Sequence, residues 1–168
     1  DIDEYPDIWA DWDYYVEGEH PVSMLIPPGR QITNVGQKSP VLMVHGISGI
    51  YPYWGFDPLQ PTESGGPSLV KELSGSFDAW RFYYPKNQDV SKSSPLLSKA
   101  LHRLQQHYYS ADQKIDIVAH SMGGLVTRHF MQSGTPDGSR IGPNRKPYPT
   151  ELQYDGEIGQ FIMMGTPN

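Results

Sequence analysis

The sequence of 168 residues contains no cysteine, so disulfide bonds, thiol nucleophiles and thiolate metal sites are all excluded. It contains no run approaching the ~18 apolar residues of a membrane span, and no signal peptide is visible. Basic residues are scarce, because 13 Lys and Arg stand against 19 Asp and Glu, for a formal net charge of −6. This balance argues against a nucleic-acid partner and leaves no polybasic patch for a membrane surface.

Patterns that would indicate a metal site are also missing. The acidic residues near the start lack the glycine and the closing Glu of a calcium loop, and we interpret them as solvated surface. His102 and His107 are five positions apart on a predicted helix, so they do not share a face, and we interpret them as solvated surface histidines. We therefore expect neither a metal nor a cofactor.

The most informative segment that is present runs from Asp116 to Gly124 and reads Asp-Ile-Val-Ala-His-Ser-Met-Gly-Gly. An apolar strand leads into Ser121 and an amphipathic stretch follows, which is the layout of a nucleophile elbow. Such a bend exposes the serine hydroxyl by straining its backbone, and crowding there requires small neighbours. Ala119 and Gly123 supply them, although Gly is the commoner residue at the first position. The alternative is a serine in an ordinary strand-to-helix turn.

A second segment, Pro40–Gly49, is an apolar strand that ends in His-Gly-x-x-Gly. Its glycines allow a sharp turn that points backbone N–H groups inward, as one half of an oxyanion hole requires. A later apolar run ends in Gly165-Thr166-Pro167. With these three motifs in this order, H-G-x-x-G, A-H-S-M-G-G and G-T-P-N, the chain resembles the lipase and esterase branch of the α/β-hydrolase superfamily.

The resemblance implies roles for individual residues. Ser121 would be the nucleophile, and the backbone N–H groups of Met122 and Ile47 would be the oxyanion donors. Such donors act where negative charge develops on the tetrahedral intermediate, and the loss of one typically slows turnover ~10²–10³-fold. His45 would shape the loop and not act as a base. The aromatic segment Tyr51–Pro67 is either an acyl-binding wall or lid, or a packed surface loop.

The hydrophobic pattern predicts a mostly parallel sheet flanked by helices. The resemblance implies that this sheet is the α/β-hydrolase fold without its last strands. One helix is expected to be capped by Ser94, with Pro95 at its first position. The predicted strands are Val22–Ile26, a strand from Pro40, Ala79–Tyr84, Lys114–His120 and Ile158–Met164, and the predicted helices are Ser68–Leu73, Ser94–Tyr108 and Met122–Met131.

The sequence does not supply an evident base or acid. In this fold an acid and then a histidine follow the serine, but the last histidine is His129, in the helix behind the elbow, and His120 is expected to point away. Such domains commonly run ~200–250 residues. We therefore expect residues 1–168 to be a single α/β-hydrolase catalytic domain that is incomplete at its C-terminus. The acids that follow Ser121 all lie in a predicted loop: Asp137, Glu151, Asp155 and Glu157.

These features predict serine-dependent hydrolysis of carboxylic esters, with triacylglycerol-like lipids as the expected substrates. An acyltransferase or amidase on the same fold remains open, as does a non-catalytic relative or inert fragment. A scaffold would need the glycines but not Ser121, which favours an enzyme. We expect a hydrophobic ester or lipid partner with only transient contact at a lipid interface. The 11 Tyr and 16 Pro favour a secreted or exported protein, and nothing indicates the oligomeric state.

Overall fold

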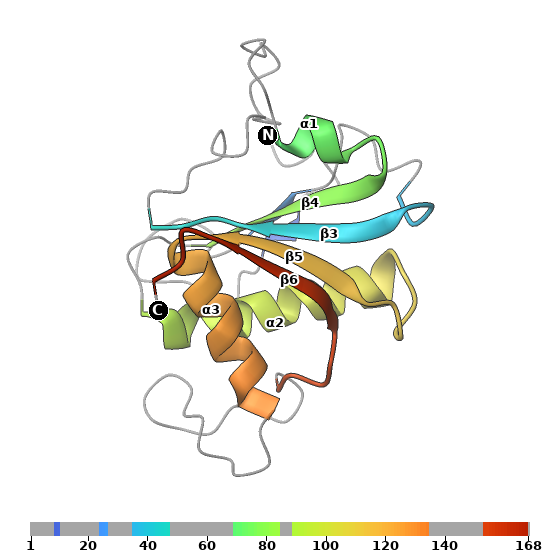
Figure 1. Cartoon of the computed structure of the whole chain (residues 1–168). Coiled ribbons are helices and arrows are strands. Elements are labelled where there is room, and N and C mark those ends of the chain that lie inside the picture. The colour runs from blue at the N-terminus through green and yellow to red at the C-terminus, as the bar shows by residue number, and fades with distance from the viewer. Residues whose placement is uncertain are drawn as a thin grey trace.

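The structure, a computed structural model, shows a six-stranded sheet in the order β1-β2-β4-β3-β5-β6, with helices on both faces (Figure 1). The predicted loop Tyr51–Pro67 and the acids Asp137 and Glu151 lie outside the described residues. The residues described are 9–10, 24–26, 35–47, 69–84, 89–134 and 153–167. The strands are β1 Trp9–Ala10, β2 Met24–Ile26, β3 Ser39–Val44, β4 Phe77–Tyr83, β5 Ile115–His120 and β6 Ile158–Met164, and the helices are α1 Leu69–Leu73, α2 Val90–His107, α3 Met122–Met131 and the 3₁₀ turn η4 Gln132–Gly134.

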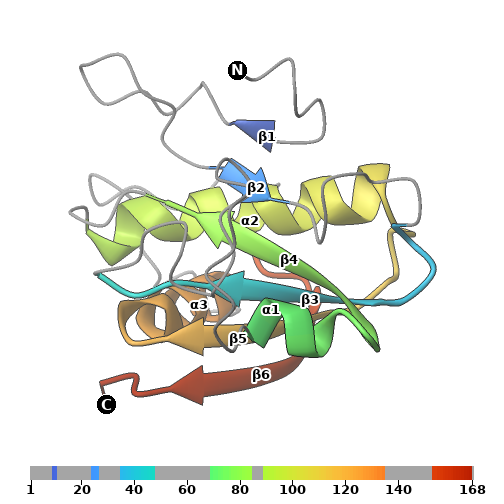
Figure 2. The same cartoon turned by 90° about the horizontal axis from the view of Figure 1, so that it is seen from above.

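Strands β4, β3, β5 and β6 are parallel, and β1 and β2 extend the sheet beside β4 in antiparallel fashion. The prediction of a mostly parallel α/β sheet is therefore confirmed, and so is a strand within Val22–Ile26, which pairs with β4 in antiparallel fashion. The four parallel strands finish at one side of the sheet, which we call its carboxyl end (Figure 2). The opposite side, where these strands begin, is its amino end. All three sequence motifs follow strands at the carboxyl end.

Alternating side chains of the parallel strands build two cores. On one face, Leu42 and Val44 of β3 pack with α2 and α3 in a large cluster that includes the fully buried Phe130. On the other face, Val41 and Met43 form a small cluster with α1 and its neighbours. Because successive strand residues point to opposite faces, a parallel strand buried on both sides reads as a continuous apolar run. This explains the apolar runs Pro40–Val44 in β3 and Ile117–Ala119 in β5.

Helix α2 begins earlier than the sequence pattern predicts. Its N-cap is Asp89, whose carboxylate accepts a hydrogen bond from the Ser91 backbone N–H at 2.7 Å, so the prediction of Ser94 as cap is wrong. Pro95 lies inside the helix and not at its first position. Ser94 is buried, and its hydroxyl pairs with His129 Nδ1 at 3.0 Å. The hydroxyl that suggested a cap is therefore an α2–α3 contact.

A hydrogen-bond network closes the amino end of the sheet. The Tyr109 hydroxyl, just after α2, donates to Asp78 Oδ2 at 2.9 Å and accepts from Trp80 Nε1 at 2.9 Å. The same carboxylate oxygen accepts the Gly36 N–H from the turn before β3. Burial raises the pKa of Tyr109, so its phenol remains a donor at neutral pH. The network ties β4, the end of α2 and the turn into β3 together.

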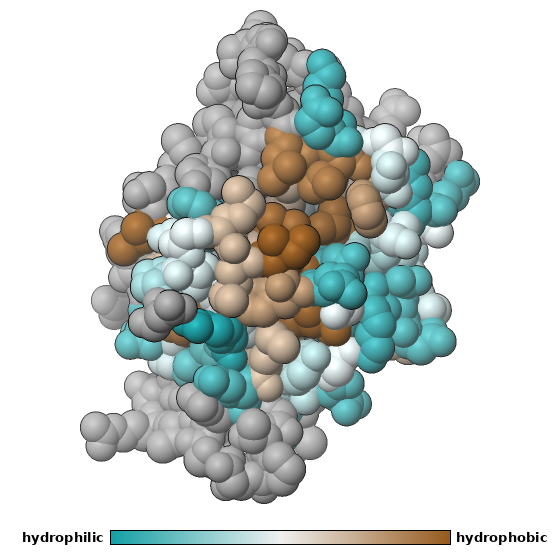
Figure 3. Space-filling view, viewed as in Figure 1, coloured by the Kyte–Doolittle hydropathy of each residue, from teal (hydrophilic) through white to brown (hydrophobic). Residues whose placement is uncertain are grey.

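Strand β6 is the outer strand of the described sheet, and most of its side chains are exposed. Ile162, Met163 and Met164 are exposed at 54%, 46% and 42%, well above the values usual for such residues in a parallel sheet. On the face of the molecule that is seen in Figure 1, apolar side chains gather over the sheet (Figure 3). None of the helices in the described part of the chain has the length and hydropathy needed to cross a bilayer.

Candidate active site

Ser121 occupies the turn between β5 and α3 in a strained backbone conformation. Its φ of 52° and ψ of −122° make it the only non-glycine residue with positive φ among the described residues. Side chains avoid this region, and holding one there costs on the order of 1–3 kcal/mol. The Ser121 N–H donates to Met164 O at the end of β6 at 2.9 Å, and Ser121 O accepts from the Gly124 N–H at 3.1 Å. Two neighbouring elements therefore fix the strained turn.

Glycines of the motifs bring the three loops into direct contact. A Cβ on Gly46 would lie 2.7 Å from Ser121 Cβ, so the loop after β3 packs against the serine itself. A Cβ on Gly123 would lie 2.5 Å from the carbonyl oxygens of Val44 and His45, and one on Gly124 would lie 2.1 Å from Thr166 Oγ1. Real Cβ atoms do not approach other atoms so closely. The three motifs, far apart in sequence, thus meet at one point at the carboxyl end of the sheet.

The two predicted oxyanion donors flank this point. Met122 is the first residue of α3, where backbone N–H groups have no intrahelical acceptor. Ile47 lies in the loop after β3, one residue beyond Gly46, and its side chain is 55% exposed. The N-terminus of α3 also adds a partial positive charge beside Ser121. Each of these two N–H groups therefore belongs to the residue that directly follows one partner of the Gly46–Ser121 contact.

His45 is buried against Tyr84, the residue that follows β4. Its Nε2 accepts the Tyr84 backbone N–H at 3.1 Å, and its Nδ1 lies 2.7 Å from the carbonyl oxygen of Gly46. Burial lowers the pKa of His45, with the two backbone hydrogen bonds acting in the opposite direction. With both ring nitrogens engaged by backbone groups, His45 holds the loop and does not face a reacting hydroxyl. Sequence reasoning missed Tyr84, because only the parallel pairing of β3 with β4 brings it to His45.

Of two other histidines near the elbow, His120 lies differently from the sequence-based expectation and His129 lies as expected. The His120 ring does not point away from the site: its Nδ1 lies 3.0 Å from where a Gly46 Cβ would stand, and its Nε2 lies 3.8 Å from the corresponding point at Gly165. It therefore packs among the three loops, because the tight turn at Ser121 brings them around the end of β5. His129 lies behind the elbow as expected, where its ring contacts Ser94 of α2.

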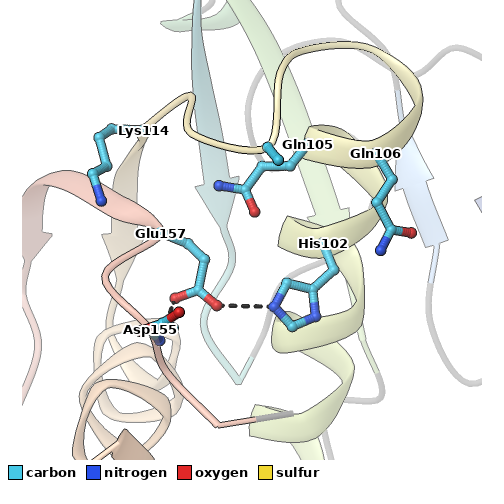
Figure 4. Close-up of a pocket in the computed structure, with 7 residues that line it drawn as sticks. His102, Gln105, Gln106, Lys114, Asp155 and Glu157 are labelled. Carbon is cyan, nitrogen blue, oxygen red and sulfur yellow. Dashed lines mark hydrogen bonds and ion pairs between the residues drawn. The ribbon is translucent and has the colours of Figure 1, made fainter. Parts of the chain in front are cut away.

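His102 is not the solvated surface residue that its helical position suggested. Its Nε2 lies 2.9 Å from Oε1 of Glu157, whose side chain is only 5% exposed (Figure 4). The partner was missed because it is 55 residues away in sequence. The pair lines a pocket of about 270 Å³. The other residues lining this pocket are Gln105, Gln106, Ala111, Lys114 and Asp155.

This histidine and carboxylate lie at the wrong end of the sheet to serve Ser121. Glu157 precedes β6, and its carbonyl accepts the N–H of Ile115, the first residue of β5. Ser121 follows the last residue of the same strand. Six strand residues at ~3.3 Å each separate the two sites by roughly 20 Å. The His102–Glu157 pair is therefore a structural contact between α2 and the start of β6.

The carboxylate of Glu157 is expected to make stability depend on pH. Burial acts to raise its pKa, but hydrogen bonds from His102 and from backbone N–H groups outweigh this and leave it below its ordinary 4.5. As pH falls, the unfolded chain binds the proton first, so the stabilisation present above pH 4.5 is lost as pH falls through the native pKa. Replacing Glu157 with Gln should lower the free energy of unfolding by about 1–3 kcal/mol at neutral pH. The free energy of unfolding of the variant should also depend less on pH in the acid range.

Urea unfolding of both proteins between pH 3 and pH 7 measures this effect. Ester turnover at pH 7 is the matched readout, and it should be unchanged in Glu157→Gln because the pair is remote from Ser121. A lost turnover with intact folding would show that the carboxylate belongs to the active site after all.

No group of three or more His, Cys, Asp or Glu side chains suited to a metal ion occurs within the described ranges. A parallel sheet with helices on both faces and a strained serine between β5 and α3 defines a protein of the α/β-hydrolase class. The sequence model of the lecithin:cholesterol acyltransferase family matches residues 72–168, more than half of the chain. The chain belongs to this family of α/β-hydrolase-related acyltransferases, which act on lipids. A comparison with curated proteins found no match.

Proposed function

We propose that the protein cleaves carboxylic ester bonds of lipids through an acyl-enzyme on Ser121. The observation that carries this proposal is the positive φ of Ser121 at a turn packed against Gly46. Backbone strain of this kind persists only where the surroundings over-determine it, and it is concentrated at functional sites. An ordinary strand-to-helix turn, the alternative, would place glycine at such a backbone conformation.

In the proposed reaction, Ser121 Oγ attacks the acyl carbonyl carbon while a base takes the hydroxyl proton. The carbonyl oxygen becomes an oxyanion, which the N–H groups of Met122 and Ile47 stabilise. The ester C–O bond then breaks, the leaving oxygen takes the proton from the base and departs as the alcohol, and water releases the fatty acid from Ser121. We propose that the base and its acid come from residues outside the described part of the chain. His45, His102 and His129 make other contacts, and the His120 ring is packed among the three loops between Gly46 and Gly165.

Acyl transfer is the second candidate, and the family match favours it. The acyl-enzyme would form in the same way, but the hydroxyl group of an acceptor lipid would replace water in the second step. The same side chains serve both reactions, so the acceptor decides between them. The tyrosine and proline content supports an exported protein as the setting for this lipid chemistry.

The test combines labelling and product analysis on the full-length protein. A fluorophosphonate should add to Ser121, as mapped by peptide mass spectrometry. Vesicles of phosphatidylcholine and a sterol, with the phospholipid acyl chain labelled, then distinguish the reactions: labelled free fatty acid indicates hydrolysis, and labelled sterol ester indicates transfer. A protein that gives neither product and no adduct would be a non-catalytic relative.

A further inference from the structure

We infer that Tyr84 is a positioning residue for the oxyanion loop and acts on it through His45; this rests on the proposed function. Tyr84 is fully buried directly after β4, and β4 lies parallel and adjacent to β3, whose end carries His45. The aromatic ring of Tyr84 stacks on the imidazole with centroids 4.2 Å apart and planes 11° apart. Two hydrogen bonds join the same pair of residues.

Tyr84 fixes which nitrogen of His45 carries the proton. The Tyr84 backbone N–H can only donate, so His45 Nε2, at 3.1 Å, must present its lone pair. The proton of the neutral ring therefore sits on Nδ1, which donates to the carbonyl oxygen of Gly46 at 2.7 Å. The lowered pKa of buried His45 keeps the ring neutral at pH 7, consistent with this single tautomer.

The bond to Gly46 O sets the direction of the proposed oxyanion donor. In a planar trans peptide, the C=O of Gly46 and the N–H of Ile47 point in opposite directions. Because His45 Nδ1 holds this carbonyl, the Ile47 N–H must point away from the imidazole. The peptide plane cannot rotate without breaking the hydrogen bond.

The Tyr84 hydroxyl fixes the preceding peptide as well. It donates to the carbonyl oxygen of His45 at 2.7 Å, and burial raises the pKa of the phenol so that it remains a donor. Two consecutive peptide planes are thus held, one by Tyr84 directly and one through the His45 ring. These planes lead into the loop whose Gly46 packs against Ser121.

The first test replaces Tyr84 with Phe, which keeps the stacked ring and the backbone N–H but removes one hydrogen bond. We expect kcat to fall about tenfold, less than the ~10²–10³ typical of losing a whole oxyanion donor, with KM unchanged. The affinity of an alkyl boronic acid, whose adduct on serine places a negative oxygen in the oxyanion hole, should fall in parallel with kcat. Tyr109→Phe is the matched control: it removes a half-buried, hydrogen-bonded hydroxyl at the amino end, so it should lower stability without changing kcat.

A pair of His45 variants tests the hydrogen bond from the His45 ring to Gly46 O independently of Tyr84. The amide nitrogen of His45→Asn can replace Nδ1 and donate to Gly46 O, whereas His45→Gln can replace only the Nε2 acceptor. We expect His45→Asn to retain more kcat than His45→Gln, and the reverse order would overturn the inference. A wild-type kcat and boronate affinity in Tyr84→Phe would overturn it too. Wild-type protein without turnover or a serine adduct would instead overturn the proposed function, and the inference with it.

Discussion

Replacing Ser121 with Ala is expected to reduce kcat of the full-length protein on the order of 10⁶-fold, the loss seen when a serine hydrolase loses its nucleophile. The Ser121 hydroxyl forms the covalent intermediate in the proposed reaction, and no other non-glycine residue within the described ranges has a positive φ. Turnover of a labelled ester and fluorophosphonate labelling measure the effect. Retained turnover would contradict the assignment of the nucleophile.

The stability of two inactive variants provides a second, independent readout at Ser121. Alanine keeps a Cβ at φ 52°, whereas glycine tolerates this conformation without strain. Relief of ~1–3 kcal/mol of strain is partly offset by the greater flexibility of glycine in the unfolded chain. We therefore expect Ser121→Gly to be about 1 kcal/mol more stable than Ser121→Ala in urea unfolding. Equal stabilities, or a more stable alanine variant, would show that the turn is not strained.

Replacing Gly123 with Ala is the second change with a large expected effect. Helix propensity alone would favour alanine here by ~1 kcal/mol, since Gly123 is the second residue of α3. The new Cβ would, however, lie 2.5 Å from two carbonyl oxygens at the end of β3, which are backbone atoms that cannot rotate aside. We expect a net loss of roughly 3 kcal/mol, as is typical of overpacked sites. Displacing the loop after β3 should also lower kcat about 10²-fold.

Gly75→Ala is the matched control for Gly123→Ala. Its Cβ would meet nothing closer than the Glu72 carbonyl oxygen at 4.0 Å, in the turn after α1. This variant should therefore be neutral or slightly stabilising and fully active. Urea unfolding and ester turnover of both variants make the comparison. If Gly123→Ala behaves like Gly75→Ala, the close packing of the elbow on β3 does not exist in solution.

Elements with strong local signals could be predicted from the sequence. The helix Met122–Met131 and the strand Ile158–Met164 have the bounds that their apolar patterns predict. The start of α2 could not be placed as well, because Ser94 and Asp89 both have side chains able to cap a helix. Only the packing of α2 against α3 determines that Ser94 faces His129 instead of a helix end.

The parts of the site that depend on strand pairing could not be predicted. Ser121 and its glycine neighbours form a local motif, and the structure places them in the expected strand-turn-helix setting. Tyr84 lies 39 residues from His45 along the chain, and nothing near either residue in sequence indicates that they touch. The same holds for the His102–Glu157 pair, whose partners come from α2 and the start of β6. Such contacts follow from the order of strands in the sheet.

That strand order has one more consequence. The chain winds from β3 to β4 on one side, and then returns across β3 to β5 and on to β6 on the other side. The segments after β3 and β5 lead to helices on opposite faces of the sheet (Figure 1). This reversal of winding is the topological switch point at which open α/β sheets bind their ligands. Gly46 and Ser121 meet at this switch point. The order of the strands therefore determines where the candidate site lies, independently of which side chains would carry out the reaction.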